Sequence, residues 1–444
     1  MRGAIAAGHP LTAEVGARVL REGGNAVDAL LAAAFAAFVT EGPLTGPAGG
    51  GFLLVARTGE PAVVLDCFFA EPSRRLGELE EVLVDFADSG TQAFHVGAGS
   101  VAVPGLVAGL EEAQRRFASR PWRELVEPAL ELARNGVPVD PPREFLFGIL
   151  REILLRTESG RAIYGGSGRI ETASFVPTLE LLRDAGASAV REVVPELAGD
   201  LDAYEVRALE PIAAGLAGVR VLTTPPPSRG GRIVLDVLSG LAGLERWSLA
   251  GEAELVARSY GGARGPLTGT THISVLDADG TAASLSSTLG SGSGLFRGGT
   301  QLNNMLGELD VIGVGAREPG ERLSSMMAPT VVLDEAGRSR LVIGSAGSVR
   351  LAGAIAQVTW RILRGLGVAA AIDAPRVHVE GPTLHLEGGW SDEDVDGVSA
   401  RWEVVRWEGL NLYFGGVQAV ERTPEGTLAA AGDPRRGGVG LVVP

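Results

Sequence analysis

The run from Ala29 to Val39 (ALLAAAFAAFV) is the most apolar segment of the chain and limits how the chain can fold. A helix that crosses a bilayer needs about 20 consecutive apolar residues, so this run is much too short for a membrane span. Alanine has the highest helix propensity, and a helix that is apolar on every side has to be covered on every side. We therefore expect a helix buried between layers of other structure, and no membrane partner.

Helical and strand-like patterns divide unevenly along the chain. Helical spacing is present at Leu11–Arg21 and again from Pro104 to about Glu210, with an interruption in the glycine-rich segment 160–168. Short strands dominate from Thr270 onward, and helical spacing returns at 351–366. Individual strands are predicted at Phe52–Ala56, Ala62–Cys67, Thr330–Leu333 and Arg340–Ile343. This order predicts an α/β protein in which helices sandwich sheets.

Size and charge narrow the classes of function. The chain has 444 residues, of which 45% are hydrophobic, and it has no low-complexity linker, so one large compact domain is the expected organisation. The formal net charge is -15, and the acidic residues are spread along the chain. Such a surface repels phosphate backbones, so we expect no nucleic acid as a partner.

Cys67 is the only cysteine, which excludes an internal disulfide and a thiolate metal site of the usual spacing. The residues before His9 contain no apolar region long enough for a signal peptide. Cytoplasmic localisation is therefore the default expectation, although a chain trimmed of its leader, and hence secreted, would have the same sequence.

The segment from Gly269 to Thr288 has the pattern of two strands joined by a tight turn. Ala278-Asp279-Gly280 is the expected loop, because its glycine supplies the left-handed position that such a turn needs. A register centred on Asp279 and free of bulges places Thr270 opposite Thr288. Opposed Cβ atoms in an antiparallel pair lie about 4.5–5.5 Å apart, so the two hydroxyls are expected within hydrogen-bonding distance.

Two interpretations of this threonine pair stay open at this point. Threonine pairs across strands are common in sheets and need no function. A threonine hydroxyl is a useful nucleophile only with a base beside it, and an N-terminal threonine can use its own α-amine. That second interpretation requires cleavage of the Gly269–Thr270 bond. His272 is expected to be a core histidine, because the sequence places no Ser or Asp partner for it.

The same segment resembles the start of the small subunit of gamma-glutamyltransferases, which are N-terminal nucleophile hydrolases. The matching string is Gly269-Thr270-Thr271-His272-x-Ser274-Val275-x-Asp277-x-Asp279-Gly280. Other motifs similar to that family occur in the same order along nearly the whole chain. They include Gly23-Gly24-Asn25-Ala26-Val27-Asp28-Ala29, Gly49-Gly50-Gly51-Phe52, Leu302-Asn303-Asn304, Leu323-Ser324-Ser325-Met326, Gly344-Ser345-Ala346-Gly347-Ser348, Asp373-Ala374-Pro375-Arg376 and Asp433-Pro434-Arg435-Arg436-Gly437-Gly438.

The resemblance implies a four-layer αββα sandwich of the N-terminal nucleophile hydrolase type. It also implies that the chain cuts itself into a large subunit, residues 1–269, and a small subunit, residues 270–444, which stay together in one domain. The two fragments would then be each other's partners, with a small-molecule amide as substrate. No metal and no cofactor are implied, and the formation of a homodimer is left open.

The resemblance also implies roles for individual residues. Thr270 would be the nucleophile, first in cleavage after Gly269 and then in turnover, and Thr288 would hydrogen-bond to it. Ala346 and Gly347 match two adjacent glycines whose N–H groups form the oxyanion hole in the family. Ser324 and Ser325 match residues that help to hold the α-carboxylate of the substrate.

The sequence departs from the family where the substrate head group binds. An arginine that clamps the α-carboxylate in the family is replaced by Phe68, which turns a charged contact into an apolar surface. Gly290, Met305 and Glu308 occupy the positions that meet the α-amino group, and of these only Glu308 can pair with an ammonium. Arg74 and Arg75 lie close by in sequence but are expected on the surface.

Three functions follow from this pattern. The first is gamma-glutamyl transfer or hydrolysis through an N-terminal threonine, on gamma-glutamyl or related amides. The second is an amidase or acylase of the same family that acts on a non-glutamyl acyl amide, because the binding groups for a free glutamyl head are largely missing while the reactive groups remain. The third is an inert, unprocessed homologue with a binding role.

Overall fold

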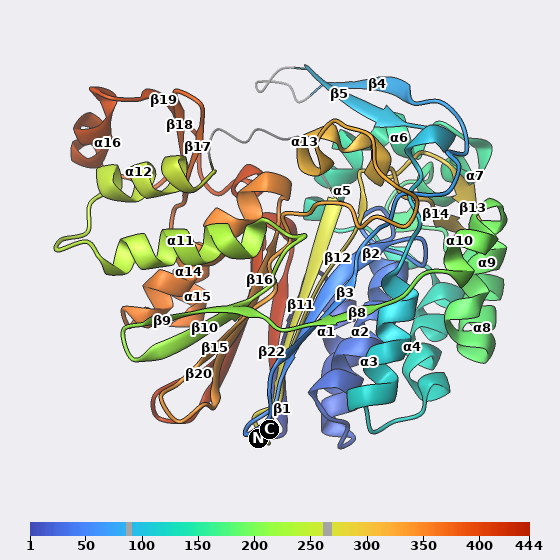
Figure 1. Ribbon diagram of the computed structural model, residues 1–444, viewed down its shortest axis with the longest axis horizontal. Coiled ribbons are helices and arrows are strands. Elements are labelled where there is room, and N and C mark those ends of the chain that lie inside the picture. Colours follow the sequence, from blue (N-terminus) through green and yellow to red (C-terminus); the bar gives the residue numbers. More distant parts are fainter. Residues whose placement is uncertain (86–90, 261–268) are drawn as a thin grey trace.

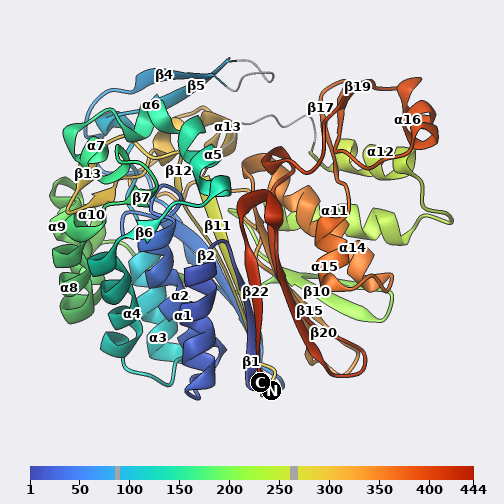
Figure 2. The ribbon, with the colours of Figure 1, turned by 180° about the vertical axis from the view of Figure 1, so that it is seen from behind.

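Two antiparallel sheets lie face to face at the centre of the protein, and helices cover the outer face of each (Figures 1 and 2). The computed structural model describes residues 1–85, 91–260 and 269–444. The predicted four-layer αββα arrangement is confirmed, because helix, sheet, sheet and helix follow one another across the molecule.

The seven-stranded sheet carries the predicted hairpin in its middle. Its strand order is β22-β1-β11-β12-β2-β3-β8, and every neighbouring pair is antiparallel. The strands are β1 (Gly3–Ala7), β2 (Gly50–Ala56), β3 (Val63–Cys67), β8 (Arg207–Leu209), β11 (Gly269–Asp277), β12 (Ala282–Gly290) and β22 (Val439–Val443).

The six-stranded sheet packs against the first sheet through β16 and β20, which contact β11. Its order is β21-β20-β16-β15-β10-β9. The strands are β9 (Ile212–Leu216), β10 (Val219–Thr223), β15 (Thr330–Leu333), β16 (Ser339–Ala346), β20 (Gly416–Arg422) and β21 (Leu428–Gly432).

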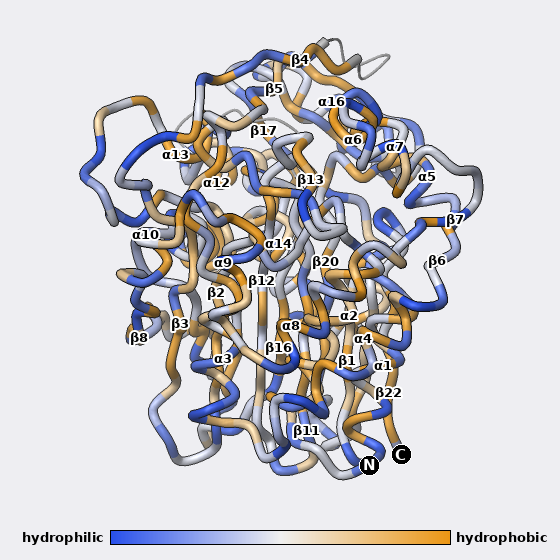
Figure 3. The backbone as a smooth tube through the Cα atoms, turned by 90° about the vertical axis from the view of Figure 1, so that its right-hand side faces the viewer, coloured by the Kyte–Doolittle hydropathy of each residue, from blue (hydrophilic) through white to orange (hydrophobic). Residues whose placement is uncertain are grey.

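Two hydrophobic cores result from this layering, because successive residues of a strand point to opposite faces of its sheet. In β2, Phe52 and Leu54 belong to the core between the sheets, whereas Leu53 and Val55 belong to the core beneath the helices. Figure 3 shows that many of the most hydrophilic segments lie in the outer loops. Because both faces of such a strand are buried, its sequence is a continuous apolar run and does not alternate between apolar and polar residues.

The helical layer over the seven-stranded sheet consists of α1 (Pro10–Arg21), α2 (Ala26–Thr40), α3 (Leu106–Phe117), α4 (Trp122–Asn135) and α8 (Val176–Ala185). The layer over the six-stranded sheet consists of α11 (Gly230–Ala242), α14 (Leu351–Leu363) and α15 (Val368–Asp373).

Helix α2 contains the apolar run and is buried along its whole length, as predicted. Its start is fixed by a capping box, in which the Asn25 side chain accepts from the Asp28 N–H and the Asp28 carboxylate accepts from the Asn25 N–H. Among the described residues, no helix has the length and apolar character needed to span a membrane.

The remaining elements are short and lie mostly around the top of the molecule in Figure 1. The glycine-rich segment 160–168, expected as an interruption, is in part helical. The helices are α5 (Pro141–Ile149), α6 (Arg151–Leu154), α7 (Glu158–Tyr164), α9 (Val190–Val193), α10 (Ala198–Asp202), α12 (Leu249–Tyr260), α13 (Leu309–Ile312) and α16 (Asp392–Ser399). The strands are β4 (Glu80–Asp85), β5 (Thr91–Val96), β6 (Val137–Pro138), β7 (Arg169–Ile170), β13 (Phe296–Arg297), β14 (Thr300–Gln301), β17 (Val377–Glu380), β18 (Thr383–Leu386) and β19 (Glu403–Arg406).

The parts of the chain before and after Thr270 contribute strands to both central sheets. In the seven-stranded sheet, β11 and β12 lie between β1 and β2. In the six-stranded sheet, β10 pairs with β15, and β9 pairs with β10 at the edge. Neither part therefore contains all the strands of either central sheet.

Candidate active site

Thr270 lies in β11 at an irregularity of the strand pairing. Residues 271–276 pair with β12 in the predicted register, but Gly269 lies opposite Gly290 instead of continuing that register. Between these pairs, one residue of β11 faces two residues of β12, which is a β-bulge. The prediction that Thr270 and Thr288 form a direct cross-strand pair is therefore wrong, because it assumed a hairpin without a bulge.

The hydroxyl of Thr288 contacts the backbone just before Thr270. Its Oγ1 donates to the carbonyl oxygen of Gly269 and accepts from the N–H of Gly290 at 2.8 Å. Both threonines are buried, so water competes little for these bonds. A donor on this oxygen polarises the carbonyl of the peptide bond between Gly269 and Thr270.

One side of Thr270 borders a cavity that we call the methionine cavity. It is lined by Phe68, Thr270, Thr288, Gly290, Met305, Glu308, Val311, Ser325, Met326, Met327, Ser348 and Leu351. Most of the predicted site residues are among them, although they come from distant parts of the sequence. Half of the lining residues are apolar and larger than alanine.

No basic side chain lines the methionine cavity in the described part of the chain. Phe68 is 1% exposed and stacks on Phe52, with ring centroids 5.4 Å apart. Arg75 pairs with Glu71 at 3.2 Å, and Arg74 is exposed. Neither Arg74 nor Arg75 therefore supplies the positive charge that the resemblance predicted at the position of Phe68.

Glu308 is the one acidic side chain among the lining residues of this cavity. Its Oε1 accepts from the N–H and the hydroxyl of Ser291, each at 3.0 Å, while its Oε2 is buried with no hydrogen-bond partner. Burial raises the pKa of this carboxyl from 4.5 to about 7. At neutral pH the side chain can therefore either donate or accept a hydrogen bond.

Gly290 leaves no room for a side chain. Its φ is +69°, and a Cβ built there would lie 2.2 Å from Asn304 Oδ1 and 3.1 Å from Glu308 Oε1. Asn304 Oδ1 in turn accepts from the N–H of Ser291 at 2.7 Å. The space that a polar side chain at this position would need is filled by Asn304 and Glu308, beside the buried Met305.

The two predicted serines differ in position. Ser325 lines the methionine cavity, and its Oγ accepts from the N–H of Met327 at 3.1 Å. Ser324 is not among the lining residues, and its hydroxyl donates to the carbonyl of Pro227 at 3.5 Å. Only one of the pair is therefore placed to touch a molecule in this cavity.

The segment at the end of β16 contributes to the lining of both cavities that Thr270 borders. Ala346 ends the strand, Gly347 has φ +131°, and Ser348 has φ +55°, which is unusual for a residue with a side chain. Ser348 lines the methionine cavity, and its buried Oγ has no partner. Sequence reasoning missed Ser348, because a left-handed conformation at serine has no signal in the sequence.

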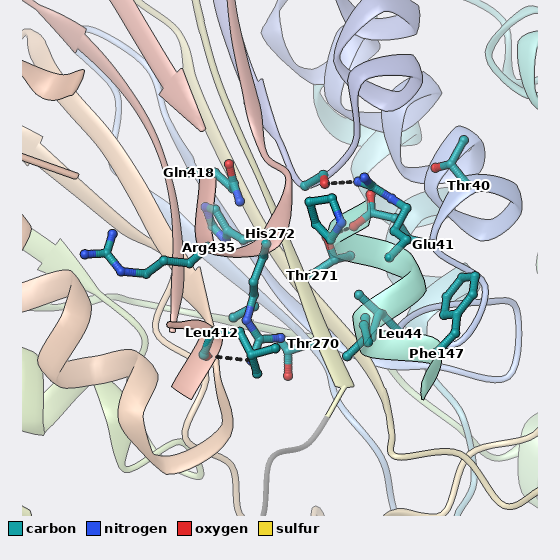
Figure 4. Close-up of a pocket in the computed structure, with 16 residues that line it drawn as sticks. Thr40, Glu41, Leu44, Phe147, Thr270, Thr271, His272, Leu412, Gln418 and Arg435 are labelled. Atoms are coloured by element: carbon teal, nitrogen blue, oxygen red, sulfur yellow. Dashed lines mark hydrogen bonds between the residues drawn. The ribbon is translucent and has the colours of Figure 1, made fainter. Parts of the chain in front are cut away.

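A second cavity, which we call the arginine cavity, also borders Thr270 (Figure 4). Its charged lining residues are Glu41, Arg143, Arg435 and Arg436, and its larger apolar ones are Leu44, Pro142, Leu146, Phe147 and Leu412. Ala346 and Thr271 line it as well. Thr270 is the residue that both cavities share.

Glu41 and His272 belong to internal networks beneath the arginine cavity. Glu41 accepts from the Thr271 hydroxyl at 2.6 Å, and burial raises its pKa. The two ring nitrogens of His272 contact the hydroxyls of Ser286 at 2.8 Å and Ser274 at 2.9 Å. Burial lowers the pKa of His272 to about 3, so the ring is neutral and held in the core, as predicted.

Within residues 1–85, 91–260 and 269–444, no group of three or more acidic, histidine or cysteine side chains is arranged to hold a metal ion.

Comparison with known proteins relates the whole chain to one group of enzymes. The sequence profile of the family described as Gamma-glutamyltranspeptidase matches residues 12–174 and 250–443. Acylase ACY 1 proenzyme from Pseudomonas sp. (strain SE83) is 27% identical, over 100% of this chain and 94% of its own length. Glutathione hydrolase proenzyme from Escherichia coli (strain K12) is also 27% identical, over 98% of this chain and 90% of its own length.

Comparison with solved structures supports the fold. The crystal structure of cephalosporin acylase from Bacillus halodurans superimposes with a TM-score of 0.83 at 21% sequence identity, covering 99% of this chain and 95% of that one. The two proteins therefore share their architecture across their full length.

Proposed function

The chain belongs to the gamma-glutamyltranspeptidase family, whose members hydrolyse amides or transfer their acyl groups, and we propose that Thr270 is its nucleophile. In this proposal the chain first cuts itself between Gly269 and Thr270. Both relatives described above are named proenzymes, which supports such a step.

In the self-cleavage step, Thr270 Oγ1 attacks the carbonyl carbon of Gly269, and the peptide C–N bond breaks to leave an ester. Breaking the C–N bond frees the Thr270 α-amine, which takes up the hydroxyl proton. Water then hydrolyses the ester, which releases the Gly269 carboxylate and restores the Thr270 hydroxyl. Support comes from the Thr288 hydroxyl, which donates to the Gly269 carbonyl oxygen where negative charge develops. The fragments 1–269 and 270–444 would stay together, because their strands are interleaved in the seven-stranded sheet and pair at β10 and β15 in the six-stranded sheet.

In turnover, Thr270 Oγ1 attacks the substrate amide while the α-amine takes its proton and passes it to the leaving amine. The acyl group then moves from the Thr270 ester to water or to an acceptor amine. Backbone N–H groups at Ala346 and Gly347, followed by Ser348, are suitable donors for the tetrahedral oxyanion.

The methionine cavity is the proposed site for the acyl group, and its composition favours an acyl part without a free α-carboxylate. An unpaired carboxylate would be costly in a cavity whose described lining contains no basic side chain and includes Phe68 and three methionines. Glu308 Oε2 could meet one polar group of the acyl chain. The absence of a basic side chain from the described lining of the methionine cavity is the observation that favours an acylase for apolar acyl amides over a gamma-glutamyl enzyme.

Self-cleavage is tested on a denaturing gel with N-terminal sequencing of the fragments. The purified protein should give two fragments, the smaller beginning at Thr270, and Thr270→Ala should remain a single chain. An intact wild-type chain after long incubation, or a cleaved Thr270→Ala chain, would overturn the proposal and favour an inert homologue.

Acyl preference is tested with 4-nitroanilides that differ only in the acyl group: gamma-glutamyl, butyryl, hexanoyl and phenylacetyl. We expect kcat/KM for the best apolar acyl group to exceed that for gamma-glutamyl by at least roughly tenfold, the change that 1.4 kcal/mol produces. Efficient, saturable turnover of the gamma-glutamyl compound would refute the apolar assignment and leave the Thr270 mechanism standing.

A further inference from the structure

The arginine cavity has no role in the proposed function so far, yet it borders the nucleophile directly. If the acyl group occupies the methionine cavity, the scissile carbonyl meets Thr270 and the amine part of the substrate extends to the other side. The inference below therefore rests on the proposed function, because that function decides which part of the substrate reaches this cavity.

Arg436 differs from the other arginines of this cavity. Arg143 pairs with Asp140 and donates to the Gly8 carbonyl. Arg435 pairs with Glu387 at 2.6 Å and with Asp433, and Figure 4 shows its side chain pointing away from Thr270. Both guanidinium groups are therefore already neutralised by carboxylates of the protein.

The Arg436 guanidinium has no carboxylate within 4.0 Å among the described residues. Its Nε and Nη1 are buried without a hydrogen-bond partner, and its Nη2 makes one long bond of 3.4 Å to the Leu412 carbonyl. Burial lowers its pKa to about 10, so the group is still charged at neutral pH. A buried cation whose N–H groups have no hydrogen-bond partner is energetically costly unless an anion pairs with it.

The position of this guanidinium relates it to the reaction. A Cβ built on Gly347 would lie 3.9 Å from Arg436 Nη2, so the cation lies beside the segment proposed to hold the oxyanion. Leu44, Phe147 and Leu412 provide apolar surface in the same cavity. The chemistry that fits is a compact amine with an apolar body and a carboxylate.

We propose that Arg436 forms a carboxylate-binding subsite for the amine part of the substrate, and for an acceptor amine, on the side of Thr270 opposite the acyl cavity. Two open N–H groups on one planar guanidinium suit a carboxylate that bridges them. Leaving groups and acceptors such as amino acids would be preferred to neutral amines of the same shape.

The first test measures binding and needs no catalysis. Calorimetric titration of the purified protein, and of Thr270→Ala, compares 4-aminobenzoate with 4-aminobenzamide, which differ in charge but hardly in shape. We expect 4-aminobenzoate to bind at least roughly tenfold more tightly, the ratio that 1.4 kcal/mol corresponds to. Arg436→Met should reduce that ratio to near one, whereas Arg436→Lys should retain part of it.

The matched control is Arg340→Met. Arg340 also has a buried Nε without a partner, but it lies at the opposite end of β16 from Ala346. This variant should keep the wild-type binding ratio. Thermal unfolding of each variant verifies that it is folded, so a lost ratio can be assigned to the missing guanidinium.

The second test uses the best acyl group from the 4-nitroanilide series, joined to 4-aminobenzoate or to 4-aminobenzamide. The preference for the anionic leaving group should appear mainly in KM. A wild-type binding ratio near one, or a ratio that survives in Arg436→Met, overturns the subsite. A fall in kcat of Arg436→Met that is equal for both leaving groups also overturns it, because it would assign Arg436 to the oxyanion.

The two tests separate failure of this inference from failure of the proposed function. Hydrolysis without charge selectivity leaves the Thr270 mechanism intact and removes the subsite. Selective binding of 4-aminobenzoate with no hydrolysis of any amide supports the subsite and removes the proposed enzyme.

Discussion

The two cavities that meet at Thr270 differ in the charged groups that line them. Among the described residues, half of the lining of the methionine cavity is apolar, no lining residue is basic, and the one carboxyl has a pKa raised to about 7. The arginine cavity contains several charged groups, most of them neutralised within the protein and one guanidinium left open. The proposed nucleophile, Thr270, can distinguish the two ends of an amide, because each end meets a different environment.

The largest expected effect concerns the apolar wall. Phe68→Ala removes a ring that is 1% exposed and stacked on Phe52, and should lower the free energy of unfolding by about 3–5 kcal/mol. Urea denaturation measures this loss when Phe68→Ala is compared with its parent, both in the uncleaved Thr270→Ala chain. Phe147 is half-buried in the wall of the arginine cavity, so Phe147→Ala should lower the free energy of unfolding clearly less than Phe68→Ala does. Equal losses would show that the two walls are not packed differently.

The next effect concerns the peptide bond before Thr270, the residue that both cavities share. Thr288→Val keeps the side-chain shape but loses the hydroxyl that donates to the Gly269 carbonyl, so self-cleavage should slow by about 10²–10³-fold. A time course of fragment appearance on gels measures the rate. Cleavage at the wild-type rate would contradict a role for Thr288 at this carbonyl.

A smaller effect concerns the raised pKa of Glu308. Because the folded pKa of about 7 lies above the ordinary 4.5, the folded state holds this proton more tightly than the unfolded state. The resulting stabilisation is fully present below pH 4.5 and is lost as the pH rises through 7, up to about 3 kcal/mol in all. Glu308→Gln should remove this part of the pH dependence.

Urea denaturation at pH 5 and pH 8, in the Thr270→Ala background, compares the two proteins. The loss of stability between these pH values should be smaller in Glu308→Gln than in its parent. An unchanged pH dependence would mean that Glu308 titrates normally and that the methionine cavity is wetter than its lining suggests.

The smallest effect is an expected absence of change. Arg74→Ala alters an exposed side chain, so the free energy of unfolding should stay within about 0.5 kcal/mol of the parent. The ratio of kcat/KM between gamma-glutamyl and hexanoyl anilides should also stay the same. A large change in that ratio would show that Arg74 reaches the methionine cavity during turnover.

Local sequence patterns predicted much of the fold because they act over short distances. The apolar run of α2 and the turn at Gly280 each depend on neighbours in sequence, and the register of residues 271–276 follows from that turn. The bulge beside Thr270 does not follow from neighbours in sequence. The N–H of Leu289 donates to the carbonyl of Leu44 at 2.9 Å, and that contact depends on tertiary packing.

The same distinction applies to the site. Phe68 and Glu308 could be singled out from the sequence because each replaces a residue type at a recognisable position of a motif. Arg436 lies within a recognised motif, but its open donors become visible only when the partners of Arg143 and Arg435 are known. Whether a buried cation is neutralised depends on the whole fold.

The ends of the chain lie side by side, which has a consequence for how the catalyst could be made. β1 and β22 are neighbours in the seven-stranded sheet, the Arg2 N–H donates to the Val443 carbonyl at 2.8 Å, and the two termini meet at one edge of the molecule in Figures 1 and 2. A circularly permuted gene could begin at Thr270, continue through a short linker from Pro444 to Met1, and end at Gly269. Removal of its initiator methionine would expose the threonine amine. The proposed catalyst would then form without any self-cleavage between Gly269 and Thr270.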